Sequence, residues 1–204
     1  MQFKLLIGTN NRGKVEEYSR LLNNLPIALT TPQQERITGD PNETGASFSE
    51  NALIKAQYYA SKTGLPTLAD DSGLEVDALD GAPGIYSARY AGGTATDNEN
   101  NDLLLSNLSD TPWERRTARF RCVIALAISG HGSELFEGTC YGYVTREIKG
   151  ANGFGYDPLF YFPYFGKTFG EVDPDSKDAV SHRGVATNKL FKRLQCLLAQ
   201  DSIE

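Results

Sequence analysis

Strand-like and helix-like patterns follow one another along this chain of 204 residues, and their order constrains the fold more than any other feature. Short apolar runs, or apolar residues at every second position, indicate strands, and apolar residues three and four apart indicate helices. These patterns predict strands at 3–7, 27–31, 67–70, 73–79 and 118–128, with 134–149 as the hairpin partner of the last. Helices are predicted from about 14 to 25, 47 to 63, 96 to 108 and 176 to 199. This mixed order predicts an α/β fold in which helices cover the faces of a sheet.

Charge and cysteine content limit the classes of function. Acidic residues number 26 and basic ones 20, and the net charge of −6 argues against nonspecific binding to nucleic acid or anionic membranes. The three cysteines form no Cys-x-x-Cys pair, so free thiols in a reducing compartment are the simple interpretation. The first apolar run is too short for a signal sequence, and no run approaches the roughly 18 residues of a membrane span. We therefore expect a soluble cytoplasmic protein, in which a few local Lys and Arg can still hold a small anionic ligand.

A polar segment, GTNNRGK at residues 8–14, lies between the first predicted strand and the first predicted helix. Backbone N–H groups at the start of a helix attract phosphate, and the Thr, Asn and Lys side chains add donors. The segment matches the beginning of a Walker A loop, but Val15 stands where that loop needs a Ser or Thr hydroxyl for Mg²⁺. A phosphate-binding loop and a plain polar turn that caps the helix are equally good interpretations of this segment alone.

Two adjacent carboxylates, Asp70 and Asp71, stand in the apolar stretch LADDSGLEVDAL at the predicted end of a strand. Two ionised neighbours repel each other, and a divalent cation removes that cost because hard oxygen ligands suit Mg²⁺. Alternatively, one Asp serves as general base for a metal-held water. Successive side chains of an extended segment point to opposite faces, so we expect only one of the two to face a site. The plainer interpretation is a turn at Asp-Ser-Gly, and it is favoured if the pair is considered alone.

A second Gly-rich segment, NGFGYDP at residues 152–158, places glycines on both sides of Phe154. Glycine lets the backbone approach a flat ligand closely, a Phe ring can stack on a base, and Asp157 can accept hydrogen bonds from ring N–H groups. The plainer interpretation is a hairpin loop whose aromatic side chains pack in the core, and it is slightly favoured for the segment alone.

Cationic side chains occur at Lys177 and in the sequence SHRG at residues 181–184. Ser181 is suited to cap a helix, while His182 and Arg183 can donate hydrogen bonds to carbonyl or phosphate oxygens. A surface cluster of charges is the commoner fate of such residues. The other histidine, His131, is interpreted as a turn residue because glycines flank it.

These four segments occur together, and as a set they resemble the inosine/xanthosine triphosphate pyrophosphatases, a family of house-cleaning nucleoside triphosphate pyrophosphatases. The resemblance extends from residue 3 to about residue 198, and it is specific because six short motifs agree in order. The matching motifs are TxNxxK at 9–14, SFxENAxxKA at 47–56, DDSGLxVD at 70–77, GxPGxYSARY at 81–90, GFGYDP at 153–158 and SHRGxA at 181–186. The family often has Gly where Asn10 stands in this chain.

The resemblance implies one domain over residues 1–204, with an elongated mixed α/β sheet, flanking helices and two lobes around a central cleft. It also implies a homodimer. The implied activity is the Mg²⁺-dependent hydrolysis of non-standard purine nucleoside triphosphates, namely dITP, ITP and XTP, to the monophosphate and pyrophosphate. Such an activity removes deaminated purines from the nucleotide pool.

The resemblance also implies roles for individual residues. Asp71 would accept a proton from the attacking water and bind the metal, Glu43 would be a second metal ligand, and Ser72 would lie beside the substrate. The other implied substrate-binding residues are Thr9, Asn10, Asn11, Arg12, Gly13 and Lys14 for the phosphates, Phe154, Gly155, Tyr156, Asp157, His182 and Arg183 for the base, and Lys55 and Lys177 as further cations.

Two other functions remain compatible with the motifs. A P-loop kinase or ATPase is supported by the Walker-like segment and opposed by Val15. A non-enzymatic nucleotide sensor would need the phosphate loop and the base pocket, but neither Asp71 nor a metal. In a pyrophosphatase we expect a hydrogen-bond donor of the protein to recognise the 6-keto oxygen of the base. Adenine has an amino donor at that position, so two donors would face each other and a buried group would stay unpaired.

Overall fold

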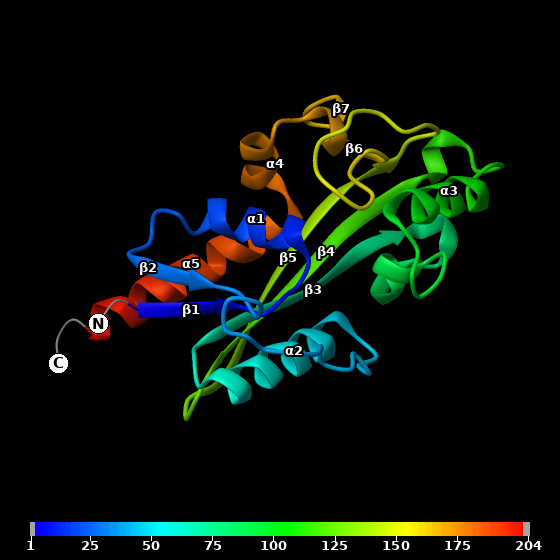
Figure 1. Ribbon diagram of the computed structural model, residues 1–204. Coiled ribbons are helices and arrows are strands. Elements are labelled where there is room, and N and C mark those ends of the chain that lie inside the picture. The colour runs from blue at the N-terminus through cyan, green and yellow to red at the C-terminus, as the bar shows by residue number, and fades with distance from the viewer. Residues whose placement is uncertain (1–2, 202–204) are drawn as a thin grey trace. The chain divides into compact units, whose positions relative to one another are not determined.

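A computed structural model describes residues 3–201 of the protein, with side chains for residues 3–199 (Figure 1). The strands are β1 (Phe3–Ile7), β2 (Ile27–Thr30), β3 (Thr67–Val76), β4 (Thr117–Ile128), β5 (Gly132–Val144), β6 (Phe160–Phe162) and β7 (Lys167–Thr168). They form one mixed sheet in the order β2-β1-β3-β4-β5-β6-β7, in which β1 is parallel to β2 and β3 and β6 is antiparallel to β5 and β7. The helices are α1 (Arg12–Leu21), α2 (Phe48–Thr63), α3 (Asp97–Asn107), α4 (Pro174–Val180) and α5 (His182–Asp201). The predicted α/β class, with a mixed sheet and flanking helices, is confirmed.

The chain divides into two compact units. The first unit contains the described residues up to Asp71, Cys122–Gly138 and the described residues from Arg183 onward. The second unit contains Ser72–Arg121 and Thr139–His182. Strands β3, β4 and β5 therefore contribute residues to both units. The single domain with two lobes around a central cleft stays a prediction.

In the first unit, helices lie on both sides of the strands (Figure 1). Leu5 and Ile7 of β1 pack in a buried cluster with Tyr18 of α1 and Leu190 of α5. Helix α2 lies on the other side of β1 (Figure 1). The loop that leaves the end of β1 therefore emerges between helices from both faces of the sheet.

A separate cluster of buried apolar side chains forms the core of the second unit. It joins Leu74 of β3, Leu104 of α3, Phe120 of β4 and Phe160 of β6. The ring centroids of Phe120 and Phe160 are 4.6 Å apart. Tyr156 belongs to the same cluster, so the Gly-rich segment 152–158 is attached directly to this core.

Side-chain caps determine where the first three helices begin. Asn11 accepts a hydrogen bond from the Lys14 N–H at 3.0 Å, so α1 begins at Arg12, two residues earlier than predicted. Helix α1 also ends at Leu21, before the predicted residue 25. Ser47 accepts a hydrogen bond from the N–H of the third residue of α2, and Thr96 with Glu99 forms a complete capping box at α3.

Two further predictions, of a strand and of a helix, are wrong. Residues 67–79 were expected to form two strands with a bend at Asp-Ser-Gly, but β3 is continuous from Thr67 to Val76. Asp70 and Asp71 therefore lie inside a strand and not at its end. The helix expected from 176 to 199 is two helices, because Ser181 has an extended backbone with ψ of 159° and separates α4 from α5.

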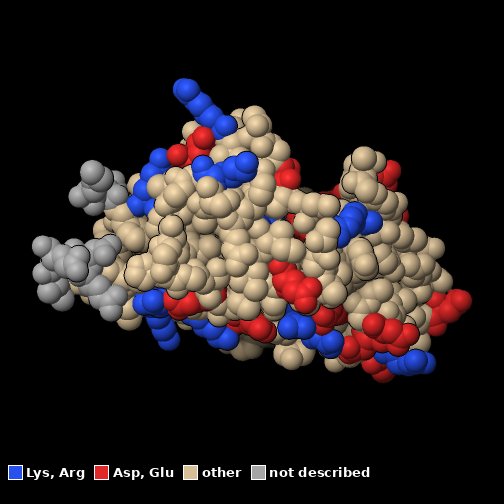
Figure 2. Space-filling model, turned by 90° about the horizontal axis from the view of Figure 1, so that it is seen from below, with Lys and Arg blue, Asp and Glu red and all other residues tan. Residues whose placement is uncertain are grey.

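The surface of the described residues carries mixed charge. On the face shown in Figure 2, Lys and Arg side chains are interspersed with Asp and Glu. None of the helices in the described part of the chain has the length and apolar character needed to cross a bilayer. Cys122, Cys140 and Cys196 are free thiols, as expected, and His131 lies in the turn between β4 and β5.

Candidate functional site

The predicted phosphate loop, residues 8–14, connects β1 to α1 in the first unit. The Thr9 hydroxyl accepts a hydrogen bond from the Asn11 N–H at 3.2 Å, and the Asn11 side chain caps the helix. The backbone N–H groups of Arg12 and Gly13 make no hydrogen bond to any described residue. They are the donors that this helix start offers to a phosphate.

Asp70 and Asp71 contact different partners, as expected for neighbours in a strand. Asp70 is 1% exposed, and its carboxylate lies 3.0 Å from the Lys14 ammonium and 3.1 Å from the Arg183 guanidinium. Arg183 also forms an ion pair with Glu17, a buried carboxylate of α1. Burial alone would raise the pKa of Asp70, but Lys14 and Arg183 outweigh it and hold that pKa well below its usual range. Asp70 therefore stays ionised and ties the phosphate loop to α5.

Asp71 contacts helix α2. Its carboxylate accepts a hydrogen bond from Asn51 Nδ2 at 3.1 Å and lies 3.2 Å from Lys55 Nζ. Lys55 Nζ also lies 3.2 Å from Glu43, so two carboxylates share one ammonium. Burial raises the pKa of Asp71, and the attraction of Lys55 offsets only part of this rise. Of the two neighbours, Asp71 is the one that more readily takes up a proton.

In the second unit, Asp157 joins the predicted base-binding residues to one another. Its Oδ2 atom accepts a hydrogen bond from the Phe154 N–H at 3.0 Å and another from Lys177 Nζ at 2.5 Å. The Lys177 ammonium also lies 5.1 Å from the centroid of the Phe154 ring, which is within the range of a cation–π contact. The buried ion pair of Lys177 with Asp157 therefore lies next to the half-buried ring of Phe154.

Helix α3 and the turn that contains Ser87 form hydrogen bonds with segment 152–158. Asp97 accepts a hydrogen bond from the Gly155 N–H at 2.7 Å, and Asn101 donates to the Gly155 carbonyl at 3.1 Å. Tyr156 is buried, and its hydroxyl donates to the carbonyl of Ser87 at 2.9 Å. These contacts fix the backbone on the C-terminal side of Phe154.

The structure divides the predicted site residues between the units. The first unit holds Thr9, Asn10, Asn11, Arg12, Gly13, Lys14, Glu43, Lys55, Asp71 and Arg183, and the second holds Ser72, Phe154, Gly155, Tyr156, Asp157, Lys177 and His182. His182 is buried and stacks on Phe120, with ring centroids 4.6 Å apart. The roles assigned to all these residues stay predictions.

Glu17 and Asn51 were not predicted, although each contacts a predicted site residue. Asn51 could have been identified from the sequence, because it is a polar residue on the face of α2 that was expected to be buried. It follows Phe48 by three positions and precedes Lys55 by four. Nothing in the spacing around Glu17 distinguishes it from a solvent-exposed helix carboxylate. Only the fold shows that it is 3% exposed and paired with Arg183.

Glu43 and Asp71 provide the oxygen ligands that suit a divalent cation. Among the described residues, no three His, Cys, Asp or Glu side chains are grouped to hold a metal on their own. Mg²⁺ is commonly held by one or two carboxylates together with phosphate oxygens and waters. Because Lys55 contacts both carboxylates, they are close enough for one cation to interact with both. The pair therefore fits a Mg²⁺ ion that binds together with a polyphosphate.

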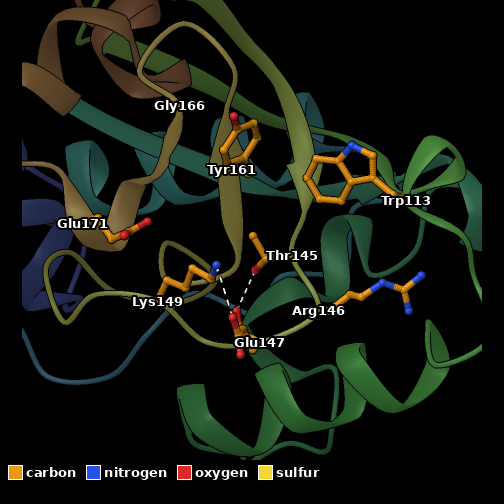
Figure 3. Close-up of a pocket in the computed structure, with 8 residues that line it drawn as sticks. All are labelled: Trp113, Thr145, Arg146, Glu147, Lys149, Tyr161, Gly166 and Glu171. Atoms are coloured by element: carbon orange, nitrogen blue, oxygen red, sulfur yellow. Dashed lines mark hydrogen bonds and ion pairs between the residues drawn. The ribbon is translucent and has the colours of Figure 1, made fainter.

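A pocket of about 360 Å³ lies in the second unit, apart from the predicted site residues (Figure 3). Trp113 and Tyr161 contribute aromatic side chains to its wall, and Lys149 pairs with Glu147 at 3.2 Å on another side. The remaining lining residues are Thr145, Arg146, Gly166 and Glu171. None of these eight residues was predicted to bind substrate.

Known proteins resemble this chain over almost its whole length. The model of the Ham1 family matches residues 5–193. A dITP/XTP pyrophosphatase of Desulforamulus reducens is 46% identical over 200 residues, which cover 98% of this chain and 100% of that protein. A dITP/XTP pyrophosphatase of Halalkalibacterium halodurans is 47% identical over 189 residues, covering 93% and 97% of the two chains.

Solved structures agree with this resemblance. The Ham1 protein of Staphylococcus aureus superimposes with a TM-score of 0.84 at 38% identity, covering 94% of this chain and 98% of its own. The HAM1 protein of Coxiella burnetii superimposes with a TM-score of 0.85 at 43% identity, covering 96% and 99%. These values extend the similarity from sequence to fold.

Proposed function

The chain belongs to the Ham1 family, and on that basis we propose that it hydrolyses non-standard purine nucleoside triphosphates to the monophosphate and pyrophosphate. The substrates are dITP, ITP and XTP, in line with the names of the dITP/XTP pyrophosphatases that it resembles. The observation that carries the proposal is the placement of Asp71, a buried carboxylate that Asn51 and Lys55 hold, with Lys55 shared by the carboxylate of Glu43. Its neighbour Asp70, held ionised by Lys14 and Arg183, is unsuited to that role.

In the proposed reaction, water attacks the α-phosphorus and the bond to the bridging oxygen of the β-phosphate breaks. Asp71 takes the proton of the attacking water, and Asn51 and Lys55 keep its carboxylate in place. The N–H groups of Arg12 and Gly13, with the Lys14 ammonium, hold phosphate oxygens. Glu43 and Asp71 would hold Mg²⁺, which would neutralise negative charge on the phosphates and on the leaving pyrophosphate.

The base is proposed to lie against Phe154, whose ring offers a flat apolar surface. Lys177 and Asp157 neutralise each other beside it, so both a donor and an acceptor are present without a net charge. A donor directed at the 6-keto oxygen rejects adenine, because two donors then face each other and a buried group loses its partner. Of the two predicted donors, His182 lies in the same unit as Phe154 and remains the proposed one, whereas the guanidinium of Arg183 is already paired with Glu17 and Asp70.

A panel of nucleotides tests this function. We expect pyrophosphate release from ITP, dITP and XTP to exceed that from ATP by about 10- to 100-fold in kcat/KM, because an unpaired buried donor costs about 1–3 kcal/mol. Pyrophosphate is measured with a coupled enzyme, and the same reactions with EDTA report the metal requirement. Equal rates with ATP and ITP would refute the proposed specificity.

The products also distinguish the proposal from its rivals. A P-loop kinase or ATPase would release ADP, and a nucleotide sensor would bind ITP without Mg²⁺-dependent release of pyrophosphate. The structure supplies an argument against the P-loop, because Val15 packs against the core of the first unit where a Walker A loop needs a hydroxyl. We also propose that the protein forms a homodimer and is located in the cytoplasm. Sedimentation of the purified chain tests whether it is a dimer.

Gly153 provides a test of the base-binding segment. Its φ is +74°, and a Cβ atom there would overlap the carboxylate of Asp157. Gly153→Ala is expected to displace Asp157 from Lys177 and from the Phe154 N–H and to raise the KM for ITP about tenfold, because a lost hydrogen bond to a charged group costs about 1.5–3 kcal/mol. The control is Gly130→Ala in the β4–β5 turn, where φ is +79° but no atom lies within 4 Å of the added Cβ. An equal KM in both variants would contradict this role of Asp157.

A further inference from the structure

Asp40 lies in the irregular segment 32–46, which joins β2 to α2 and carries Glu43. One of its carboxylate oxygens, Oδ1, accepts two hydrogen bonds, one from Asn10 Nδ2 at 2.5 Å and one from the Tyr59 hydroxyl at 2.8 Å. Asn10 belongs to the phosphate loop, and Tyr59 belongs to α2. A single side chain therefore links segment 32–46 both to the phosphate loop and to helix α2, which carries Asn51 and Lys55, the partners of Asp71.

Tyr59 is a rigid anchor for this link. The residue is 1% exposed, and its ring fills the space beside Gly8, where an added Cβ atom would come within 2.9 Å of Tyr59 Cδ2. Burial, reinforced by the hydrogen bond to Asp40, raises the pKa of Tyr59, so the hydroxyl stays a donor. Because the ring cannot shift without disturbing the end of β1, the position of its hydroxyl is fixed.

Few other contacts hold the middle of the segment. For residues 38–44, the hydrogen bonds and ion pairs that reach other elements within the described structure are those of Asp40 and the ion pair of Glu43 with Lys55. Gly39 has a φ of +84° and places little restriction on the backbone before Asp40. Glu43 follows Asp40 by three residues, so the position of Asp40 limits where the Glu43 carboxylate can go.

We propose that Asp40 is a positioning residue that holds segment 32–46 so that Glu43 stays beside Lys55 and Asp71. The inference rests on the proposed function to the extent that Glu43 there holds the metal. Groups that orient a metal-holding carboxylate commonly affect metal affinity about 10- to 100-fold when they are removed. Asp40 acts through Glu43 and does not itself touch the substrate.

Hydrogen exchange followed by mass spectrometry, on the full chain without nucleotide, tests the structural part. The N–H groups of Thr44, Gly45 and Ala46 are all hydrogen-bonded, so their exchange reports the order of the segment beside Glu43. Asp40→Ala is expected to speed their exchange about tenfold, whereas Asp40→Asn, which keeps an acceptor oxygen, recovers most of the protection. Unchanged exchange in Asp40→Ala would overturn the proposal whether or not the chain releases pyrophosphate.

The dependence of pyrophosphate release on Mg²⁺ tests the positioning part. Asp40→Ala is expected to raise the Mg²⁺ concentration for half-maximal rate about tenfold, with little change in the KM for ITP at saturating Mg²⁺. Tyr59→Phe keeps the ring against Gly8 but removes one of the two hydrogen bonds, so it should shift the Mg²⁺ dependence in the same direction by less. Tyr141→Phe, which removes a hydroxyl from a 70% exposed ring of β5 in the second unit, is the control and should behave as the unmodified chain. Faster exchange with an unchanged Mg²⁺ dependence would overturn the assignment, because Asp40 would then order the segment without affecting Glu43.

Discussion

Asp71→Asn is expected to lower kcat for ITP by at least about a hundredfold, with little change in KM or in stability. Asn has the same size and keeps an oxygen that can accept the hydrogen bond of Asn51, but it cannot take a proton from water. Burial already disfavours the charge of Asp71, and Lys55 keeps Glu43 as a partner, so the loss of that charge should cost little folding free energy. Initial rates of pyrophosphate release measure the first effect, and urea denaturation measures the second.

Asp102→Asn is the control for the loss of one negative charge. Asp102 is an exposed carboxylate of α3, and its replacement should leave the kinetics unchanged. If Asp71→Asn retains turnover within about tenfold, the barrier has changed by roughly 1.4 kcal/mol or less, and Asp71 is not the proton acceptor. If both kcat and stability fall together, the carboxylate holds the fold and its catalytic role is unsupported.

Strand β3 shows how far local sequence patterns predict this fold. The apolar residues around Asp70 were identified correctly as strand, but Asp-Ser-Gly was interpreted as a bend because these residues favour turns. In the structure, Leu68 lies in the core of the first unit and Leu74 lies in the core of the second. Burial at both ends keeps the strand extended between them, and tertiary packing of this kind overrides turn propensity. No window of sequence around residue 72 contains that information.

The prediction of the last helix was wrong for a related reason. The apolar spacing that predicts one helix from 176 to 199 continues across Ser181, so periodicity alone gives no sign of an interruption. Ser181 is 0% exposed and extended, and α5 begins directly after it. Ser181 was interpreted as a residue that caps a helix, and α5 begins directly after it, but it was not recognised as a break within the helix predicted from 176 to 199.

The candidate site could be predicted in part because its motifs are short and contiguous. The phosphate loop, the Asp pair and the segment around Phe154 each present their side chains within a few residues. Their partners come from elsewhere: Glu17 is 166 positions from Arg183, and Asn51 is 20 positions from Asp71. A pattern on one helix shows that a polar side chain is unusual, but it does not show which distant side chain meets it.

Arg183→Met is expected to lower the free energy of unfolding by about 3–5 kcal/mol. The guanidinium is 1% exposed and lies between Glu17 and Asp70, both of which are also buried. Met fills much of the same volume, so the main loss is charge and not packing. Asp70 keeps its ion pair with Lys14, whereas Glu17 loses the guanidinium that faces it. Urea denaturation of the variant, followed by fluorescence of Trp113 and by circular dichroism, measures this change.

Arg193→Met on the same helix separates the effect of burial from the loss of an ion pair. Arg193 pairs with Glu134 at 2.8 Å, but both side chains are about one-third or more exposed, so its replacement should cost less than about 1 kcal/mol. The double variant Glu17→Gln with Arg183→Met should be more stable than Arg183→Met alone, because it no longer buries the Glu17 charge opposite an apolar side chain. If Arg183→Met lowers the free energy of unfolding by no more than Arg193→Met does, the ion pairs of Arg183 with Glu17 and Asp70 stabilise the fold no more than a surface pair. Asp70 would then lack the support that keeps it ionised beside a neighbour that must take up a proton.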